Sequence, residues 1–569
     1  MSDSLTILKK YWGHEAFRSK QEDIINSILD GKDTLALLPT GGGKSICFQV
    51  PAMMMEGICI VVSPLIALMK DQVANLKSRD IEALCITSEY NHKEVDALFD
   101  RCVYGKIKFL YLSPERLLTD IAKTRIAMMK VNLIAVDEAH CISEWGYDFR
   151  PPYLKIAEIR SLHPKVPVIA LTASATPLVV KDIQDKLKFK KPNVHTKSFA
   201  RENLAYFINW DEDKLGKTEQ IAKKLKGCGI IYTRSRKGTE RVTRELRKRG
   251  LSIDFYHAGL DAETRNKKQE DWMSGRTSII TATNAFGMGI DKSNVRFVLH
   301  YDLPDTLENY YQECGRAGRD GKKAFAVAIL TKKDLVKLQE KIEQSFPEKP
   351  EIKRVYAAIG SHLQLAIGSG KEESFPIDFE KLAEHYNLNE RVIVQSIKFL
   401  EREGYISLDE TRDLHSTVKI NCSNEELYQF KLNNKNLERL IDALLRSHTR
   451  LFDEDVRISE WTLAKRLKWP KTRVESGLDH LSQAELIQYK KATNLPRITY
   501  LEERLDAKNV RISEEHYTLR KHVISEKAEA MLHYAESTSK CRSRMLVEYF
   551  GEEKSKNCGI CDFCVALKS

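Results

Sequence analysis

Short apolar runs rich in β-branched residues alternate with helical patterns up to about residue 340. The runs occupy residues 34–38, 58–62, 133–136, 166–171, 229–232, 278–282, 295–300 and 325–330. Such runs are typical of buried parallel strands that helices cover on both faces. Their number suits two successive α/β domains, which we place at residues 1–202 and 203–343 with a break near residues 198–204.

Beyond about residue 345 the pattern changes to helices with a few late strand pairs. Two segments there each predict two helices followed by a β-hairpin, with strands near Tyr405 and Val418 in the first and near Ile487 and Ile498 in the second. This order is typical of winged-helix modules, although small helical domains without a special function share it. The predicted domains are a winged-helix-like domain at 344–425, a helical linker with a second such domain at 426–515, and a small module at 516–569, with candidate wings at 411–416 and 493–496.

The length of 569 residues exceeds what one hydrophobic core supports and predicts about three to five domains. The formal charge of +11 favours a polyanionic partner only weakly, because many unrelated proteins carry a similar excess. We find no apolar run of about 18 residues and no basic-then-apolar start. We therefore expect neither a membrane span nor a secretory signal, and a cytosolic location.

A strand, a glycine-rich loop and a helix follow one another at residues 35–45. The loop and the start of the helix are Thr40, Gly41, Gly42, Gly43, Lys44 and Ser45. Glycines let backbone N–H groups wrap phosphate oxygens, and the helix N-terminus adds its dipole. Lys44 can reach the β- and γ-phosphates of a nucleotide, and the Ser45 hydroxyl can ligate Mg²⁺. Leu38 replaces the usual first glycine of this P-loop pattern, so a glycine-rich turn with a chance Gly-Lys-Ser is the alternative.

Two acids end the apolar run at residues 133–136 and favour the P-loop interpretation. Asp137 is placed to hold Mg²⁺, directly or through water, and Glu138 can orient and deprotonate the attacking water. For this pair alone, an acidic helix cap is the alternative. Lys44 lies about ninety residues upstream, as two strands of one α/β sheet allow.

The second α/β domain ends in a glycine-rich segment with two arginines, Arg316 and Arg319. Three residues apart, they are predicted to lie on one face of a helix and to present two guanidinium groups to one polyphosphate. Arginines from a neighbouring domain stabilise charge in phosphoryl transfer. A solvated basic helix is the alternative, but it explains the glycines poorly.

Together these segments resemble the superfamily 2 helicases and, within them, the RecQ family. The matching motifs are Phe17-Arg18 with Gln21, then residues 40–45, 63–72, 113–116, 137–140, 172–176, 256–260, 282–291 and 312–321. The resemblance covers residues 10 to about 340 and again about 526 to 566. It implies an α/β fold with two RecA-like parallel-sheet domains and a small zinc-binding module, and the sequence pattern places the helical and winged-helix-like domains between them.

The same resemblance implies how a nucleotide is held and used. Arg18 and Gln21 contact adenine, Gln312 belongs to the same ATP site, and Arg316 and Arg319 reach the γ-phosphate across an interdomain cleft. The implied activity is Mg²⁺-dependent ATP hydrolysis coupled to 3′-to-5′ movement on single-stranded DNA and to duplex unwinding, in DNA repair and recombination. The implied partners are single-stranded DNA and duplex DNA with a 3′ tail, bound by a monomer in the cytoplasm, or in the nucleus of a eukaryote.

Residues 141–151, which we call the aromatic loop, directly follow the two acids. The loop holds Trp145, Tyr147, Phe149 and Arg150, with a glycine inside and a proline at its end. Aromatic faces stack on bases without sequence preference, so an exposed DNA-contacting loop is one interpretation. An ordinary turn whose aromatic side chains pack inward is the other. Trp145, Phe149 and Arg150 match the aromatic-rich loop of RecQ helicases, which links DNA contact to ATP hydrolysis, whereas Tyr147 replaces its usual histidine.

Four of the twelve cysteines cluster near the C-terminus: Cys541, Cys558, Cys561 and Cys564. Their spacing can close a tetrahedral thiolate site around Zn²⁺. An iron–sulfur cluster uses similar spacing, and free or redox-active cysteines are the third interpretation. The segment resembles the RecQ zinc-binding module, and we favour a structural zinc ion. RecQ proteins commonly place this module directly after the α/β domains, whereas about 180 residues intervene here.

The leading hypothesis is thus an ATP-dependent DNA helicase. A DNA-binding switch protein that uses ATP to change its grip without unwinding is a second, and an RNA helicase is a third.

Overall fold

The computed structural model describes every residue except 1–2, 40, 88–89, 91, 144, 147–148, 285, 287–291, 410–415, 493–494, 554 and 569. It forms two compact units. The larger unit comprises Met1–Ile342 together with Arg520–Ser569, and the smaller unit comprises Glu343–Leu519. The C-terminal segment therefore belongs to the same unit as the α/β domains, although a long segment separates them in sequence.

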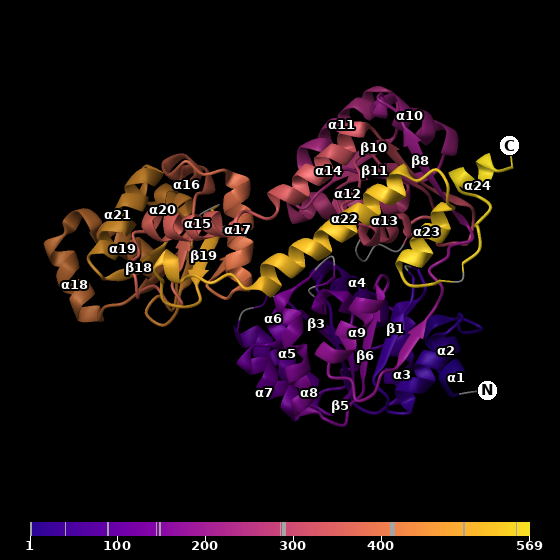
Figure 1. Ribbon diagram of the computed structural model, residues 1–569. Coiled ribbons are helices and arrows are strands. Elements are labelled where there is room, and N and C mark those ends of the chain that lie inside the picture. Colours follow the sequence, from indigo (N-terminus) through magenta and orange to yellow (C-terminus); the bar gives the residue numbers. More distant parts are fainter. Residues whose placement is uncertain are drawn as a thin grey trace. The chain divides into compact units, whose positions relative to one another are not determined.

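The first α/β domain, drawn in indigo to purple in Figure 1, contains a seven-stranded sheet with the order β3-β4-β2-β5-β6-β1-β7. All its paired strands run parallel. The strands are β1 (Thr34–Leu37), β2 (Ile58–Val62), β3 (Ala83–Ile86), β4 (Phe109–Leu112), β5 (Val131–Val136), β6 (Val168–Thr172) and β7 (Val194–Thr196). The helices are α1 (Asp3–Trp12), α2 (Gln21–Leu29), α3 (Lys44–Met54), α4 (Ile66–Lys77), α5 (His92–Tyr104), α6 (Pro114–Leu117), α7 (Asp120–Met128), α8 (Ile159–Leu162) and α9 (Pro177–Lys186).

The second α/β domain contains a six-stranded parallel sheet with the order β10-β11-β9-β12-β13-β8. The strands are β8 (Leu204–Trp210), β9 (Cys228–Tyr232), β10 (Ile253–Tyr256), β11 (Ile279–Ala282), β12 (Val295–His300) and β13 (Ala324–Leu330). The helices are α10 (Lys214–Leu225), α11 (Arg236–Lys248), α12 (Ala262–Ser274), α13 (Leu307–Cys314) and α14 (Lys332–Gln344).

The predicted α/β class with two parallel sheets is confirmed. Each of the eight predicted apolar runs forms a strand, and most of their side chains are buried because helices cover both faces of the sheets. The strands β3, β4, β7, β8 and β10 were not predicted. The chain passes from the first sheet to the second between Thr196, where β7 ends, and Leu204, where β8 begins.

The C-terminal module completes the larger unit. It consists of α22 (Arg520–Glu536), α23 (Arg542–Tyr549) and α24 (Asp562–Ala566). Its side chains Met531, Tyr534 and Phe550 are buried in one hydrophobic core together with side chains of both sheets. The C-terminal module therefore packs against both α/β domains, although the smaller unit separates it from them in sequence.

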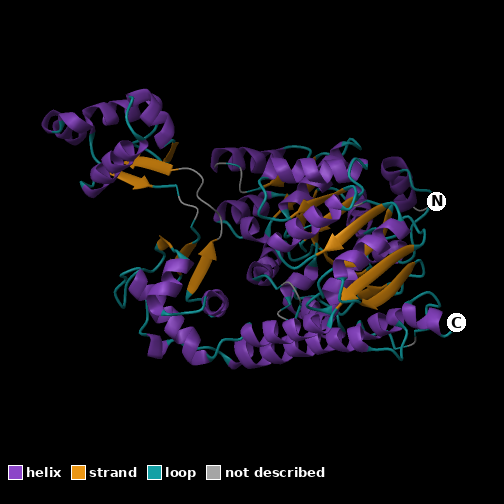
Figure 2. Cartoon of the chain, turned by 90° about the horizontal axis from the view of Figure 1, so that it is seen from above, coloured by secondary structure: helices purple, strands orange, loops and turns teal. Residues whose placement is uncertain are grey.

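The smaller unit holds two three-stranded sheets, with the orders β14-β19-β15 and β17-β16-β18 (Figure 2). Its strands are β14 (Ser374–Pro376), β15 (Ile406–Asp409), β16 (Ser416–Ile420), β17 (Val456–Ile458), β18 (Ile487–Lys490) and β19 (Arg497–Tyr500). Its helices are α15 (Lys349–His362), α16 (Phe379–Tyr386), α17 (Glu390–Arg402), α18 (Asn424–Asn433), α19 (Lys435–Ser447), α20 (Glu460–Leu467) and α21 (Lys471–Gln483).

The predicted hairpins in this unit are wrong, because the strands exchange partners. Ile406 of β15 pairs with Tyr500 of β19, and Ile420 of β16 pairs with Ile487 of β18. Each strand joins the core that its apolar side chains complete: Ile420 and Ile487 share a core with α19–α21, whereas the Tyr500 ring lies 6.0 Å from that of Tyr356 on α15. Residues 416–490 are therefore an inner module inserted between two strands of an outer one. The candidate wings fall largely on residues 410–415 and 493–494, outside the described residues.

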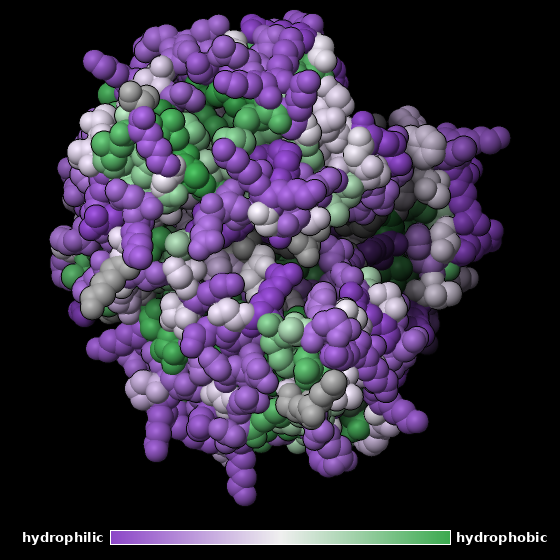
Figure 3. Space-filling view, turned by 90° about the vertical axis from the view of Figure 1, so that its right-hand side faces the viewer, coloured by the Kyte–Doolittle hydropathy of each residue, from purple (hydrophilic) through white to green (hydrophobic). Residues whose placement is uncertain are grey.

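The surface carries mostly hydrophilic side chains on the face shown in Figure 3, with hydrophobic ones in small groups. No helix in the described part of the chain combines the length and the apolar character that crossing a membrane requires.

Candidate nucleotide site and metal centre

The glycine loop between β1 and α3 has the conformation that a phosphate-binding loop needs. Gly41 and Gly43 have φ angles of 80° and 74°, in the left-handed region that favours glycine. A Cβ on Gly43 would lie 2.4 Å from Nε2 of Gln21, so a larger residue there would displace the Gln21 side chain that binds the loop. Lys44 and Ser45 begin α3 directly after the loop, at the helix end that attracts anions. Thr40, also assigned to this site from the sequence, lies outside the described residues.

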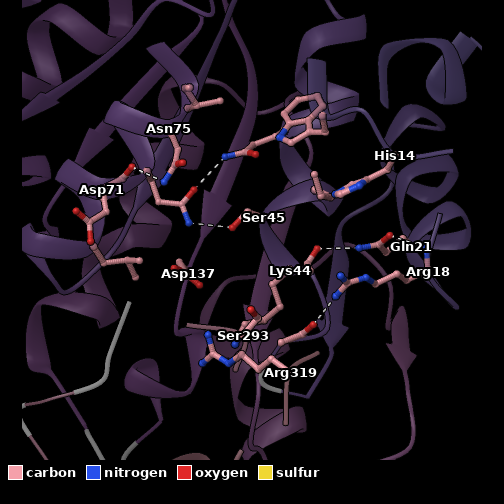
Figure 4. Close-up of a pocket in the computed structure, with 18 of the residues that line it drawn as sticks. His14, Arg18, Gln21, Lys44, Ser45, Asp71, Asn75, Asp137, Ser293 and Arg319 are labelled. Atoms are coloured by element: carbon pink, nitrogen blue, oxygen red, sulfur yellow. Dashed lines mark hydrogen bonds between the residues drawn. The ribbon is translucent and has the colours of Figure 1, made fainter. Parts of the chain in front are cut away.

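Two side chains from the segment before and at the start of α2 brace this loop from outside. Arg18 donates from Nη1 to the Gly41 carbonyl at 2.7 Å. Gln21 donates from Nε2 to the carbonyls of Gly43 at 3.0 Å and Gly42 at 3.3 Å. Figure 4 shows both side chains beside the loop, with His14 nearby. Both line the cavity described below, and their predicted contact with adenine stays a prediction.

The two acids lie at the carboxyl end of β5, in the same sheet as β1. Burial, and then the neighbouring charge of Glu138, raise the pKa of Asp137 to about 6, against the effect of Lys44. Burial also disfavours the charged form of Glu138, but Lys44, His140 and Arg316 outweigh it and lower the pKa of this carboxyl group. Oε2 of Glu138 is buried without a hydrogen-bond partner among the described residues. Two adjacent buried carboxyl groups of this kind fit a divalent cation and a water molecule.

Further polar side chains support the site and were not predicted. Gln72 donates from Nε2 to Oγ of Ser45 at 2.9 Å, and its own Oε1 accepts from Gln49 at 3.0 Å. Nδ1 of His140 lies 2.9 Å from Oγ1 of Thr172 at the end of β6. Gln72, His140 and Thr172 all lie within motifs that carry the family resemblance, so the sequence held a signal for them.

Arg316 and Arg319 do not share a helix face, so this prediction is wrong. The helix α13 ends at Cys314, and both arginines lie in the turns that follow. Gly318, between the two arginines, has a left-handed φ of 65°, and a Cβ there would lie 2.5 Å from Nδ2 of Asn203. A left-handed residue at this position is incompatible with one continuous α-helix that carries both arginines.

The turns after α13 are held from the linker between the two sheets. Arg201 donates from Nη2 to the carbonyl of Ala317 at 3.0 Å. Asn203 donates from Nδ2 to the carbonyls of Gly318 at 2.7 Å and Lys322 at 2.9 Å. These supporting residues were missed, because nothing in the linker sequence indicates which segment it contacts.

One cavity of about 680 Å³ collects the predicted groups from both sheets. Lys44, Asp137 and Arg319 point into it (Figure 4). The other predicted residues that line it are Arg18, Gln21, Gly41, Gly43, Ser45, Glu138, Gln312 and Arg316. Its volume lies within the range of ordinary ligand sites. The arrangement can bind a nucleoside triphosphate between a P-loop and two arginines, with two acids beside the γ-phosphate.

The aromatic loop is only partly described, because residues 144 and 147–148, Tyr147 among them, lie outside the described residues. Trp145, Phe149 and Arg150 are half-buried. Trp145 packs against the hydrophobic core, and Arg150 donates from Nη1 to the Pro64 carbonyl at 3.3 Å. The three side chains are thus neither fully exposed, as a DNA-contacting loop predicts, nor packed wholly inward, as an ordinary turn predicts.

The four C-terminal cysteines come together as predicted. Their sulfur atoms all lie within 4.8 Å of one another, and Sγ of Cys541 lies 3.5 Å from Cys558 and 3.8 Å from Cys561. Four thiolates around one tetrahedral ion with bonds of about 2.3 Å stand about 3.8 Å apart. An iron–sulfur cluster places several atoms between the thiolates and needs a wider spacing. The cysteines therefore fit a single tetrahedral ion, and no disulfide joins them.

Four family models match successive parts of the chain. The DEAD/DEAH box helicase model matches residues 18–183, and the helicase conserved C-terminal domain matches residues 213–321. The model of the RecQ helicase winged-helix domain of Bacteroidota matches residues 418–491, which is the inner module of the smaller unit. The RecQ zinc-binding model matches residues 501–565.

Sequence relatives and solved structures agree with these matches. The chain is 42% identical to the ATP-dependent DNA helicase RecQ of Haemophilus influenzae over 61% of its own length and 56% of that protein. It is 41% identical to the probable ATP-dependent DNA helicase RecS of Bacillus subtilis over 59% of its own length and 68% of that protein. A structure of Mss116p bound to single-stranded RNA and AMP-PNP shares the fold at 16% identity, with a TM-score of 0.50 over 71% of this chain and 92% of the other.

The matched part of the chain spans 55–59% of the length of three bacterial RecQ relatives. Over that part, the P-loop, the acid pair and the arginine motif occur in order and line one cavity. Two RecQ-specific models match the C-terminal half of the chain, at residues 418–491 and 501–565. With 41% identity over two thirds of the RecS protein as well, the chain belongs to the RecQ family of helicases.

Proposed function

We propose that this protein is an ATP-dependent DNA helicase, which couples hydrolysis of Mg-ATP to 3′-to-5′ movement on single-stranded DNA and to duplex separation. The observation that carries the proposal is the cavity shared by the two sheets. Lys44 and the acid pair come from the first α/β domain, and Arg316 and Arg319 come from the second. A nucleotide that needs both sets of groups draws the two domains together when it binds, and its hydrolysis releases them.

The chemistry follows from the groups that line the cavity. Lys44 and the loop amides bind the β- and γ-phosphates, while Ser45 and Asp137 would hold Mg²⁺, which supplies positive charge to the same phosphates. Glu138 accepts a proton from the water that attacks the γ-phosphorus, which its lowered pKa permits because the carboxylate is ionised at neutral pH. The bond to the bridging oxygen breaks, ADP leaves, and Arg316 and Arg319 stabilise the charge that develops.

Two parts of this proposal, DNA as the substrate and the role in the cell, are inferred from the relatives. The proteins that the chain resembles at 42–43% identity are named ATP-dependent DNA helicase RecQ. We infer a monomer that acts on single-stranded DNA and 3′-tailed duplexes in repair and recombination, in the cytoplasm or in a eukaryotic nucleus. The basic net charge of +11 is consistent with such a partner.

A strand-displacement assay tests the proposal directly. Duplexes with a 3′ tail, a 5′ tail or blunt ends are incubated with the protein and ATP, and released strands are counted. We expect release from the 3′-tailed duplex only. Turnover that DNA stimulates without any strand release would identify a DNA-binding switch instead, and stimulation by RNA above that by DNA would identify an RNA helicase.

Replacing Trp145 with alanine should weaken the response to DNA more than basal turnover. Stacking on one base contributes about 1–3 kcal/mol, so we expect the DNA concentration for half-maximal ATPase stimulation to rise about tenfold or more. Trp210, a tryptophan of β8 with 45% of its surface exposed, provides the control as Trp210→Ala. An unchanged half-maximal concentration in the Trp145 variant would count against a DNA contact in the aromatic loop.

We also propose that the cysteine cluster binds one structural Zn²⁺, since four thiolates leave no open position for a substrate. Metal analysis should find about one zinc atom per chain. Cys561→Ser should lower the zinc content and the melting temperature, because ion binding contributes to the folding of such sites. Cys422→Ser, which changes a single cysteine in the smaller unit, should do neither. Iron in place of zinc, or no metal at all, would contradict the assignment.

A further inference from the structure

The helix α22 of the C-terminal module lies along α13 of the second α/β domain (Figure 1). The rings of Tyr534 on α22 and Tyr310 on α13 are 5.2 Å apart, and both side chains are fully buried. Because α13 leads directly into the turns that carry Arg316 and Arg319, α22 is packed against the element that places these arginines.

Lys527 is the charged side chain of α22 at this interface. It is only 8% exposed, and its Nζ lies 2.9 Å from Oε1 of Glu308 in the first turn of α13. Glu308 is itself 2% exposed. The same Nζ donates to the backbone carbonyl of Trp145 at 2.6 Å. One ammonium group therefore joins three segments that are distant in sequence.

The two partners of Lys527 belong to different α/β domains. Trp145 lies in the aromatic loop, which follows Asp137 and Glu138 of the first domain. Glu308 lies on the helix that leads to the two arginines of the second. Lys527 thus links, outside the nucleotide cavity, the loop that follows the acid pair to the helix that precedes the two arginines.

The module that carries Lys527 is anchored where the chain crosses between the sheets. Glu552 accepts hydrogen bonds from the backbone N of Phe199 at 2.6 Å and from Oγ of Ser198 at 2.8 Å. The ring of Phe550 stacks on that of Phe199, with centroids 4.7 Å apart. The module is thus held at the linker by Phe550 and Glu552, while α22 itself packs against α13 and carries Lys527 there.

Stability alone explains this lysine poorly. A buried ion pair contributes little net stability, because desolvating both charges offsets their attraction, and apolar replacements are often neutral. An ion pair does, however, require one relative placement of its partners. Here that placement involves a loop that faces DNA in the proposed function and a helix that leads to the catalytic arginines.

We propose that Lys527 is a positioning residue, which couples the state of the aromatic loop to Arg316 and Arg319 through Glu308 and α13. The inference rests on the proposed function, because its input is DNA at the loop and its output is ATP turnover. It gives the C-terminal module a role in regulating hydrolysis besides a structural one.

The test compares ATP turnover, with and without saturating single-stranded DNA, in the parent and in four variants. Lys527→Met keeps the length of the side chain and removes its charge, and Glu308→Gln removes the partner's charge while keeping its shape. Lys527→Arg restores a cation, and Lys521→Met is the matched control, because Lys521 is an exposed lysine of the same helix.

We expect Lys527→Met and Glu308→Gln to lower the maximal stimulation by about tenfold, which is typical of coupling between two sites. The DNA concentration for half-maximal stimulation should change by less than about threefold, unlike in the Trp145 variant. Lys527→Arg should recover most of the stimulation, and Lys521→Met should match the parent. Melting temperatures report whether each variant is folded.

The outcomes separate the two proposals. A parent protein whose turnover DNA does not raise overturns the proposed function, and this inference with it. A stimulated parent with equally stimulated Lys527→Met or Glu308→Gln variants overturns the inference alone. A loss of stimulation that accompanies an equal loss of basal turnover and a lower melting temperature in both variants shows a purely structural role, and also overturns it.

Discussion

Replacing Lys44 with alanine is expected to lower ATP turnover by at least about 10³-fold, which corresponds to roughly 4 kcal/mol of lost transition-state stabilisation. Lys44 begins α3, lines the cavity and lies close enough to both acids to affect their pKa values. Its ammonium group is the cation of the P-loop that can follow the γ-phosphate as charge develops on it. Turnover is measured by phosphate release at saturating single-stranded DNA.

Binding of single-stranded DNA should change by less than about threefold in the Lys44 variant, because the aromatic loop does not depend on this side chain. Lys32→Ala is a suitable control, since Lys32 is an exposed lysine before β1 that pairs with Asp30. Hydrolysis retained at the parent rate in Lys44→Ala would contradict the P-loop assignment. A parallel loss of DNA binding would indicate a misfolded first domain.

Replacing Arg316 with alanine is expected to lower turnover by about 10³-fold or more, as for arginines supplied to a phosphoryl-transfer site from a neighbouring domain. Arg316 is 5% exposed, lines the cavity, and is one of the cations that lower the pKa of Glu138. Its loss therefore removes a positive charge that acts on two groups: the γ-phosphate, and Glu138, which accepts the proton of the attacking water. The measurement is single-turnover hydrolysis with nucleotide binding followed separately.

Arg316→Lys should not restore turnover, because a lysine cannot reproduce the planar guanidinium group. Arg276→Ala supplies the control: this arginine lies in the same domain, is exposed and pairs with Asp271. Nucleotide affinity in Arg316→Ala should fall far less than the hydrolysis rate. A variant that binds nucleotide poorly but hydrolyses what it binds at the parent rate would assign Arg316 to ground-state binding instead.

That these residues line one cavity was predictable, because they occur in short, contiguous segments of the sequence. Lys44 and Ser45 follow a glycine loop, and Asp137 and Glu138 follow an apolar strand, so each pair required only a local interpretation. That the two pairs share one cavity followed from a general property of parallel sheets, whose carboxyl ends lie along one edge.

Predictions failed where a backbone path or a distant partner decided the structure. The spacing of Arg316 and Arg319 is helical, but α13 ends at Cys314, before both of them, and Gly318 between them has a left-handed conformation. The strands near Tyr405 and Val418 are consecutive in sequence, yet neither core would be complete if they paired. The order of elements along the chain cannot distinguish two strands that pair in a hairpin from two strands that each pair with a strand later in the sequence.

The C-terminal contacts left no signal in the sequence at all. Glu552 and Phe550 look like ordinary residues near a zinc module, and only the fold shows that they hold Phe199 in the linker between the sheets. Lys527 likewise reads as one exposed lysine among many on a charged helix. Its burial depends on Glu308, which lies more than 200 residues earlier.

The nested strands of the smaller unit affect how it can assemble as the chain leaves the ribosome. β19 is the central strand of the outer sheet, and it follows β15 by about ninety residues. At roughly 5–20 residues per second, β15 waits some 5–20 s, and β14 somewhat longer, for the strand that joins them. The inner module at residues 416–490 is contiguous and can fold during this interval. The unit is therefore built from the inside outwards, and its first strands to be synthesised are among its last to be paired.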